Sequence, residues 1–538
     1  MVTLTKQEHI RLVMEAHYWK SLHERAVVRL ERQRQQFQHD LALARQREAE
    51  LREQLEHERA CNRDLRQRVF GQHTEQSRLL SKVQQPTPQP KRPRGQQPGA
   101  PGHGRTRLTQ LPAREETIEL EPAVCPQCGL ALKEFPGTQD CEVVEYEVSA
   151  WRRVIHRRRY CPTCRCGCLP GIVTAPAPPR LIPMGKLGVS AWVHLLLGKF
   201  LHAQPLHRLL QDWEDQGLHL SPGTATEGLH RLAVLFEPLQ QALHERLRAH
   251  THWHADETRW EVFAEQEGKV GHRWYLWVFH TPTVAYYVLD PSRSSKVPGS
   301  VLEGVDAGIL SVDRYAAYKK YATSHPGVQL SFCWAHQRRD FLRVANDHPV
   351  LWSWAMGWVQ RISELYKLHA LRQEAGLGTA EFTACDERLR QAVQVMQHLC
   401  EQSLADKELA TAARKVLKSL QRHWAGLVVF VEQSWLPLDN NAAERALRLA
   451  VVGRKNFYGS GSQWSGEMAA TLMSLLMTVK LWKINARTWL SAYLNVCANE
   501  GGKPPSDISA FIPWQMNEAQ LAAMRAAPAA GGHGFDTS

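Results

Sequence analysis

Hydrophobic positions near the N-terminus follow a heptad spacing. Residues 22–69 contain neither Gly nor Pro and are rich in Arg, Glu, Gln and Leu. Counting alternately four and three residues onward from Leu30 to Val69 gives 12 seam positions, and eight of them are apolar. This spacing is typical of a coiled-coil seam, in which Asn62 would fix the register. We therefore predict a coiled coil over residues 1–83; one long solvated helix is the alternative, because three positions of the seam are charged.

A second helical pattern lies within residues 175–248. Pro205 opens one helix and Gly217 ends it, and Ser221 and Pro222 suit the N-cap and the first position of the next helix. Two helices joined by a short turn that contains Gly resemble a helix-turn-helix. We expect a DNA-binding region here; a purely structural helical hairpin is the alternative.

The pattern then changes to short β-rich runs, which are bounded by turn residues. The chain is helical again over residues 341–435, a loop follows, and a helix begins near Ala442. Further helices are expected over residues 466–525, and we expect residues 526–538 to form a disordered tail. These patterns predict a multidomain α+β protein. The five β-rich runs are His252–Phe263, Arg273–His280, Ala285–Leu289, Ile309–Val312 and Val328–Cys333.

Length and composition are those of a protein with a sizeable core. The chain has 538 residues, 43% of them hydrophobic and 22% charged. The longest apolar run, Val189–Leu197, is shorter than the roughly 18 residues needed to cross a bilayer. The segment Met1–Lys20 is mixed and charged, unlike a signal peptide. We expect a cytoplasmic protein that does not bind membranes.

The charge balance favours a polyanionic partner. Lys and Arg number 66 against 54 Asp and Glu, so the formal net charge is +12. Residues 1–107 carry 21 basic and 12 acidic residues, a net of +9. Residues 84–114 form a proline-rich linker with a basic cluster at Lys91, Arg92 and Arg94. Such a balance is typical of a nucleic-acid-binding protein, although a solvated basic helix is the alternative.

Residues 115–174 hold two C-x2-C motifs. Cys125 with Cys128, and Cys161 with Cys164, provide four thiolates, the set that a structural Zn2+ ion prefers. Cys166 or Cys168 could replace Cys164, and free buried cysteines are the other alternative. The runs Val143–Val148 and Arg152–Tyr160 are candidate strands. The basic stretch that includes Arg157 and Arg158 predicts DNA contact by this zinc-ribbon-like module.

Three acidic residues lie where their elements can converge. Asp256 lies within the first β-rich run, Asp313 directly follows a later one, and Glu444 lies early in the helix after the Leu438–Asn441 turn. Carboxylates from two strands and a helix can meet at one face of a mixed sheet. Oxygen donors of this kind suit Mg2+, and paired ions of this type catalyse phosphoryl transfer.

Five sequence strings carry a resemblance to a known family. The chain resembles the transposases of the bacterial insertion-sequence family numbered sixty-six over residues 111–496. The order and spacing of the strings also match, with the double cysteine motif upstream. The strings are HADET at 254–258, DRYAAY at 313–318, FCWAHQRR at 332–339, LDNNAAER at 438–445 and GRKN at 453–456.

The resemblance implies an RNase H-like DDE catalytic domain with a helical insertion. Residues 249–340 and 436–465 would form the catalytic core around the insertion at 341–435. Asp256, Asp313 and Glu444 would bind Mg2+ or Mn2+, and His336, in a C-x2-H string, would approach the scissile phosphate. The implied phosphate contacts are Arg338, Arg339, Arg445, Arg448, Arg454 and Lys455.

The implied function is DNA transposition. The enzyme would bind the terminal inverted repeats of its element, cleave the DNA and join the freed 3′-hydroxyl to target DNA, as a nucleoid-associated homodimer or higher oligomer. Arg259 and Arg314 stand where the family often has Pro and Gly, which places a need for small accessory proteins in doubt. A catalytically idle DNA-binding repressor and a zinc and coiled-coil scaffold are the rival interpretations.

Overall fold

The computed structural model describes residues 5–70, 149–160, 172–264 and 271–526. The described residues group into two units by their contacts. One unit contains the residues up to 70 together with Phe341–Gly357, and the other contains the remaining described residues. None of the described helices is both long and apolar enough to span a lipid bilayer.

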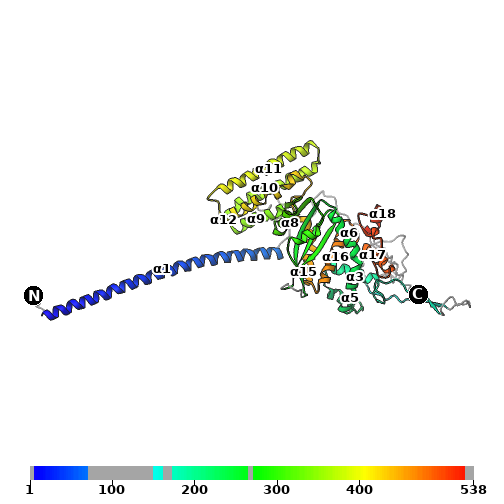
Figure 1. The fold of residues 1–538 in the computed structure, drawn as a ribbon, viewed down its shortest axis with the longest axis horizontal. Helices are drawn as coiled ribbons and strands as arrows, with labels where there is room; N and C mark the ends of the chain where they lie inside the picture. The colour runs from blue at the N-terminus through cyan, green and yellow to red at the C-terminus, as the bar shows by residue number, and fades with distance from the viewer. Residues whose placement is uncertain (1–4, 71–148, 161–171, 265–270, 527–538) are drawn as a thin grey trace, which may run out of the picture. The chain divides into compact units, whose positions relative to one another are not determined.

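The first unit is dominated by α1 (Lys6–Phe70), a single helix of 65 residues (Figure 1). The absence of Gly and Pro explains its length, because these residues end or weaken helices. Leu30 and Phe37 of the expected seam are 65% and 69% exposed. The long helix is confirmed, whereas the coiled coil stays a prediction.

A small antiparallel pair precedes the main domain. β1 (Arg159–Tyr160) pairs with β2 (Val173–Thr174). Of the expected strand Arg152–Tyr160, only the last two residues are strand. The six cysteines at 125, 128, 161, 164, 166 and 168 lie outside the described residues, as do Val143–Val148, residues 71–83, the linker 84–114 and the tail after Ala526.

The core of the second unit is a mixed six-stranded sheet in the order β5-β4-β3-β6-β7, with β8 paired to β3. β3, β4 and β5 are antiparallel neighbours, and β6, β7 and β8 run parallel to β3. The central strands are rich in Trp, Val and Leu and are buried on both faces, as strands covered by helices usually are. The strands are β3 (His252–Val262), β4 (Arg273–His280), β5 (Ala285–Asp290), β6 (Gly308–Val312), β7 (Val328–Phe332) and β8 (Gly459–Ser460).

Helices cover both faces of this sheet (Figure 1). α15 (Asn441–Phe457) packs on β3 and β4, and α16 (Gln463–Leu481) packs on β5. α8 (Ala316–Ser324) lies on the opposite face, where Tyr318 contacts Trp277 edge to face. α7 (Lys296–Val301) packs beside α8.

The helices that precede the sheet in sequence pack against helices from the C-terminal end of the chain. Ser221 caps α5 by accepting the Thr224 N–H at 3.2 Å, and Pro222 is the first helical residue, as expected. α3 packs on α17, and α6 packs on α16. The elements are α3 (Val189–Phe200), α4 (Leu206–Asp215), α5 (Pro222–Ala233), η1 (Val234–Phe236), α6 (Glu237–Arg248), α17 (Ala486–Asn499), η3 (Ser509–Phe511) and α18 (Glu518–Arg525).

The chain between β7 and α15 is helical, as expected. Arg372 of α10 is fully buried; it binds Asp386 of α11 and the backbone carbonyls of Phe430 and Val431, and so fastens three helices together. The elements are α9 (Trp334–Asp347), η2 (Pro349–Leu351), α10 (Trp352–Ala375), α11 (Ala380–Ala405), α12 (Thr411–Arg422), α13 (Trp424–Leu427) and α14 (Val429–Glu432). The expectation of an α+β protein is confirmed: the described residues form mostly helices and a mixed sheet.

Candidate active site

The sheet register places Asp256 and Asp313 at neighbouring positions. His254 of β3 pairs with Ser311 of β6 in parallel register. Asp256 lies two residues beyond His254, and Asp313 lies two residues beyond Ser311. Because side chains alternate along strands and parallel strands lie about 4.8 Å apart, the two carboxylates occupy adjacent places on one face.

The start of α15 is fastened to the same face by Asn440. Its side-chain amide donates to the Ala255 carbonyl at 2.7 Å, and its Oδ1 lies 3.0 Å from Nδ1 of His254. Its backbone N–H donates to Sγ of Cys333 at 3.2 Å. Glu444, in the first turn of α15, is therefore held beside the two aspartates.

The Leu438–Asn441 turn is stabilised by Asp439. Its Oδ1 accepts the backbone N–H of Asn441 at 3.1 Å, and its Oδ2 accepts the side-chain amide of the same residue at 2.6 Å. Asp439 therefore shapes the turn that leads into the Glu444 helix.

The carboxyl group of Asp256 has a strongly perturbed pKa. Burial, together with the charges of Glu257, Asp313 and Glu444, raises its pKa to about 8, against the lowering effect of the Glu257 N–H, which donates to Asp256 Oδ1 at 2.9 Å. Charges of one sign brought together in a partly dry site disfavour ionisation. A divalent cation would relieve this repulsion.

The Glu444 carboxylate has two neighbours, the guanidinium of Arg339 and the imidazole of His336. Arg339 of α9 donates from Nη2 to both carboxylate oxygens at 3.2 Å. Nε2 of His336 lies 3.8 Å from Oε1 of Glu444. Burial and the charge of Arg339 lower the pKa of His336, although Glu444 and Asp313 oppose this effect. These surroundings favour the neutral form of the His336 imidazole.

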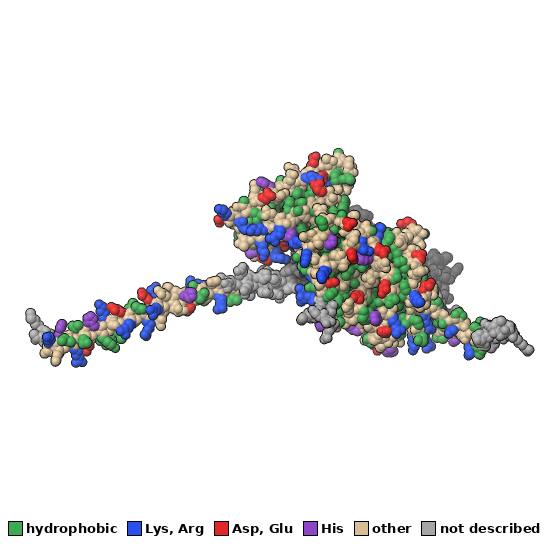
Figure 2. All heavy atoms as spheres, in the orientation of Figure 1, with side chains coloured by type: hydrophobic (Ala, Val, Ile, Leu, Met, Phe, Trp, Pro, Cys, Tyr) green, Lys and Arg blue, Asp and Glu red, His purple; other side chains and the backbone are tan. Residues whose placement is uncertain are grey.

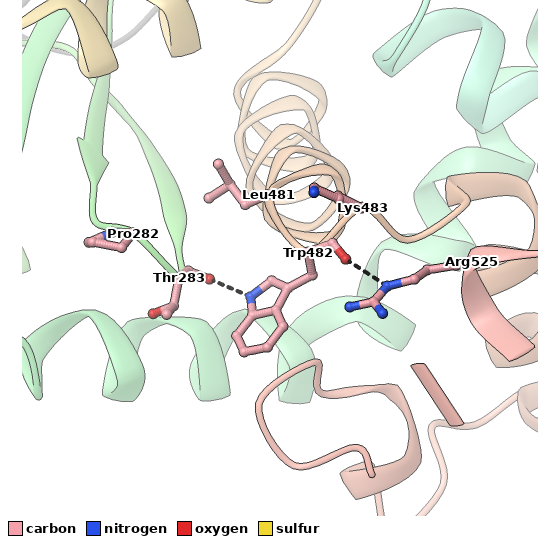
Figure 3. Close-up of a pocket in the computed structure, with 6 residues that line it drawn as sticks. All are labelled: Pro282, Thr283, Leu481, Trp482, Lys483 and Arg525. Carbon is pink, nitrogen blue, oxygen red and sulfur yellow. Dashed lines mark hydrogen bonds between the residues drawn. The ribbon is translucent and has the colours of Figure 1, made fainter. Parts of the chain in front are cut away.

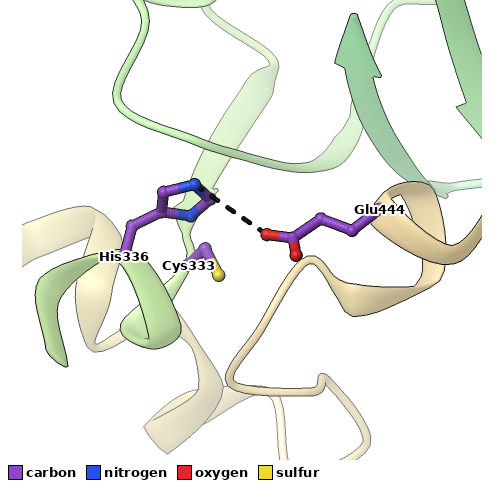
Figure 4. A group of neighbouring side chains, drawn as sticks. All are labelled: Cys333, His336 and Glu444. Carbon is purple, nitrogen blue, oxygen red and sulfur yellow. Dashed lines mark ion pairs between the residues drawn. The ribbon is translucent and has the colours of Figure 1, made fainter. Parts of the chain in front are cut away.

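Cys333, His336 and Glu444 bring their ligand atoms within 4.8 Å of one another (Figure 4). Burial raises the pKa of the Cys333 thiol to about 11, so the sulfur is protonated near neutral pH. A neutral thiol is a poor ligand for Mg2+, which prefers oxygen. Cys333 thus acts as an acceptor for the start of α15 rather than as a magnesium ligand.

The basic residues expected to bind DNA differ in their surroundings. Arg445, Arg448 and Lys455 are exposed on α15. Arg454 donates to the Thr258 hydroxyl at 3.1 Å and the Arg259 carbonyl at 2.9 Å, so it ties α15 to β3.

The remaining expected DNA contacts lie outside α15. Arg338, like Arg339, is partly exposed on α9. Arg157 and Arg158 are exposed, and Arg157 donates to the Ala175 carbonyl at 2.7 Å. Arg157, Arg339 and Arg454 of the expected set thus already form hydrogen bonds within the chain.

Sequence reasoning missed two polar groups near the carboxylates. Glu257 follows Asp256 and points to the opposite face of the sheet, where its side chain is fully buried. Arg314 follows Asp313 and binds Asp340 at 2.6 Å and Ser419 of α12 at 3.0 Å. A charged residue within a strand that is buried on both faces requires a partner, which is the signal that could have identified Glu257.

A cavity of about 390 Å³ lies elsewhere in this unit (Figure 3). It is formed by the β4–β5 turn, the end of α16 and α18, and Trp482 donates to the Thr283 carbonyl at 3.0 Å within it. None of its lining residues carries a carboxylate, thiol or imidazole, so the carboxylate cluster is the candidate active site. The lining residues are Pro282, Thr283, Leu481, Trp482, Lys483 and Arg525.

Comparisons with known proteins identify the family of the chain. The model of the family described as "Transposase IS66 family" matches residues 185–468, which include all three carboxylates. The chain belongs to this transposase family.

Three similar proteins come from Sinorhizobium fredii (strain NBRC 101917 / NGR234) and are themselves described as uncharacterized. Protein y4jD is 28% identical over 76% of this chain and 81% of its own length. Proteins y4hP and y4qI are each 26% identical, over 76% and 75% of this chain and 76% of their own lengths. No solved structure matches the chain.

Proposed function

We propose that the protein is a DNA transposase that cleaves the ends of an insertion sequence and transfers them into target DNA. The observation that carries the proposal is the cluster of Asp256, Asp313 and Glu444 on one face of the sheet. These residues come from three segments that are distant in sequence, and all lie within the region matched by the transposase family.

The sheet topology supports an RNase H-like catalytic core. Three antiparallel strands are followed by two that run parallel to the first, in the order 3-2-1-4-5 that RNase H-like domains share. In this arrangement the first strand lies at the centre of the sheet. Asp256 is therefore central, with Asp313 on the adjacent strand and the Glu444 helix across both.

The donor set fits Mg2+ or Mn2+. Asp256, Asp313 and Glu444 supply oxygen ligands, and their mutual repulsion is what a divalent cation would offset. These residues would hold two such ions, and the bound metal would supply activation of the attacking oxygen and stabilisation of the leaving oxygen. Arg339 holds Glu444 in place through both carboxylate oxygens.

The reaction is a pair of phosphoryl transfers without a covalent protein intermediate. Water attacks the phosphodiester at the end of the element, the P–O bond breaks, and a 3′-hydroxyl is released. That hydroxyl then attacks a phosphodiester of the target DNA. The exposed Arg445, Arg448 and Lys455 are suited to hold phosphates near the carboxylates.

Basic side chains also gather on α12, as Figure 2 shows. Lys415, Lys418 and Arg422 are exposed on one side of this helix. Arg314, which directly follows Asp313, donates to the Ser419 hydroxyl of α12 and so holds this basic helix near the site. We assign this surface to the DNA backbone, which basic proteins bind without regard to sequence.

The other modules complete the proposal. Residues 115–174 would bind one Zn2+ through the four cysteines and, with the region 175–248, contact the element's inverted repeats. The exposed apolar seam of α1 would pair with a second copy of the chain, because transposition holds two DNA ends together. The core would consist of 249–340 and 436–465, followed by the helical region 466–525.

Cleavage of end DNA tests the proposal. The full chain is incubated with a duplex that carries the inverted repeats flanking its gene, with Mg2+ or with a chelator. We expect new 3′-hydroxyl ends with Mg2+ and none with the chelator. Binding of the duplex without cleavage, in Mg2+ and in Mn2+, would instead identify a repressor derived from a transposase.

A further inference from the structure

We propose that Glu257, Arg293 and Tyr318 form a positioning unit, built around the buried Glu257 carboxylate, that orients the catalytic carboxylate of Asp313. The inference rests on the proposed function and assigns roles to residues outside the metal-binding triad. Glu257 lies on the sheet face opposite Asp256, so it is not a further ligand of the same metal ions.

Glu257 is held by two partners. Arg293, in the loop between β5 and α7, donates from Nε to Oε1 at 2.7 Å and contacts the same oxygen through Nη2. The hydroxyl of Tyr318 donates to Oε2 at 2.5 Å. Both carboxylate oxygens are therefore occupied, as a fully buried charge requires.

The unit reaches Asp313 through Tyr315. The guanidinium of Arg293 lies 3.8 Å from the centre of the Tyr315 ring, and the Tyr315 hydroxyl donates to the Arg293 carbonyl at 2.9 Å. The backbone N–H of Tyr315 then donates to Oδ1 of Asp313 at 2.8 Å. Arg293 thus fixes Tyr315 at its ring and at its hydroxyl, and Tyr315 fixes one oxygen of Asp313.

Glu257 thus acts on Asp313 through Arg293 and Tyr315. Loss of the Glu257 carboxylate removes the partner that holds the Arg293 guanidinium against the Tyr315 ring, and so weakens the support of Asp313. The HADET string therefore contains one proposed metal ligand, Asp256. Asp256 is followed directly by Glu257, which anchors the second proposed ligand, Asp313.

The experiment measures Mn2+ binding by full-length protein through the electron paramagnetic resonance signal of the free ion. Asp313→Asn defines how much of the binding belongs to the site. Glu257→Gln should weaken this binding roughly 10- to 100-fold, the usual effect of losing a group that orients a metal ligand. Tyr318→Phe, which removes one hydroxyl, should weaken it less.

Tyr321→Phe is the matched control. Tyr321 lies in the same helix and is 1% exposed, and its buried hydroxyl has no partner among the described residues. The Tyr321→Phe variant should bind Mn2+ with the same affinity as the wild-type protein. If the role of Glu257 is purely structural, Glu257→Gln should unfold at a lower temperature and bind Mn2+ with unchanged affinity. That result would overturn the inference.

Two further outcomes are informative. If Glu257→Gln does not fold, Tyr318→Phe decides the question, and wild-type Mn2+ affinity in that variant overturns the inference. If Asp313→Asn binds Mn2+ as tightly as wild type, the proposed metal site itself is wrong. The second result is distinct from failure of the positioning unit, in which Asp313→Asn loses binding and Glu257→Gln keeps it.

Discussion

Binding of a divalent cation at the proposed site should release a proton from Asp256. Burial and the neighbouring carboxylates raise the pKa of this group to about 8, so it is protonated in about 0.9 of the molecules at pH 7 and about 0.1 at pH 9. A carboxylate must lose its proton to ligate a metal. Saturation with Mg2+ should therefore release about 0.9 proton per site from this group at pH 7 and about 0.1 at pH 9.

Isothermal titration calorimetry in two buffers of different ionisation enthalpy measures this number directly. Mg2+ is titrated into the protein at pH 7 and at pH 9, and the difference in heat between buffers gives the protons released. Asp256→Asn should abolish the pH-dependent release. Proton release near zero at both pH values, with Mg2+ bound, would refute the reasoning that links Asp256 to the cation.

The same pKa has a consequence for stability without metal. The folded pKa of Asp256 lies above the unfolded value of about 3.9, so the folded state binds more protons between these values. Its contribution to stability is therefore fully present below about pH 4 and is lost as the pH rises toward 8. Bound Mg2+ should reduce this loss, which thermal melts at pH 5 and pH 8 with and without Mg2+ would reveal.

Three further predictions concern the scaffold and the other modules. Asn440→Ala should lower the free energy of unfolding by about 2–4 kcal/mol in denaturant titrations, because it leaves His254 and the Ala255 carbonyl buried without their partner; an unchanged midpoint would contradict this role. Deletion of residues 1–83 should lower the oligomer mass in light scattering, and a wild-type protein that is monomeric with and without end DNA would argue against the coiled coil. Cys125→Ser should reduce bound zinc below one ion per chain, and an unchanged stoichiometry would disprove the assigned ligand.

The strands of the sheet were predictable from local sequence. The runs that begin at His252, Arg273 and Ala285 are rich in aromatic and β-branched residues and match β3, β4 and β5 to within one residue. The start of α5 was predictable because Ser221 and Pro222 act within one turn. Such features depend on neighbours in sequence, so the pattern alone identifies them.

The arrangement of the site depended on contacts between distant segments. The adjacency of Asp256 and Asp313 follows from the parallel pairing of β3 with β6, which no local pattern specifies. Asn440 occupies the N-cap position of α15, yet its side chain bonds across to β3 and does not cap the helix. Arg454 was expected to contact phosphate because it is basic, and its bond to the Arg259 carbonyl appears only in the folded chain.

The most direct test of the central claim is strand cleavage by single variants of the triad. Asp256→Asn, Asp313→Asn and Glu444→Gln should each abolish Mg2+-dependent cleavage of end DNA while binding of that DNA stays nearly unchanged. Double variants should be little worse, because groups that act together are not additive. Asp439→Asn is the matched control and should keep measurable cleavage, since Asp439 bonds to Asn441 within the turn. Cleavage by Glu444→Gln, with none by Asp439→Asn, would contradict the account and identify a different third carboxylate.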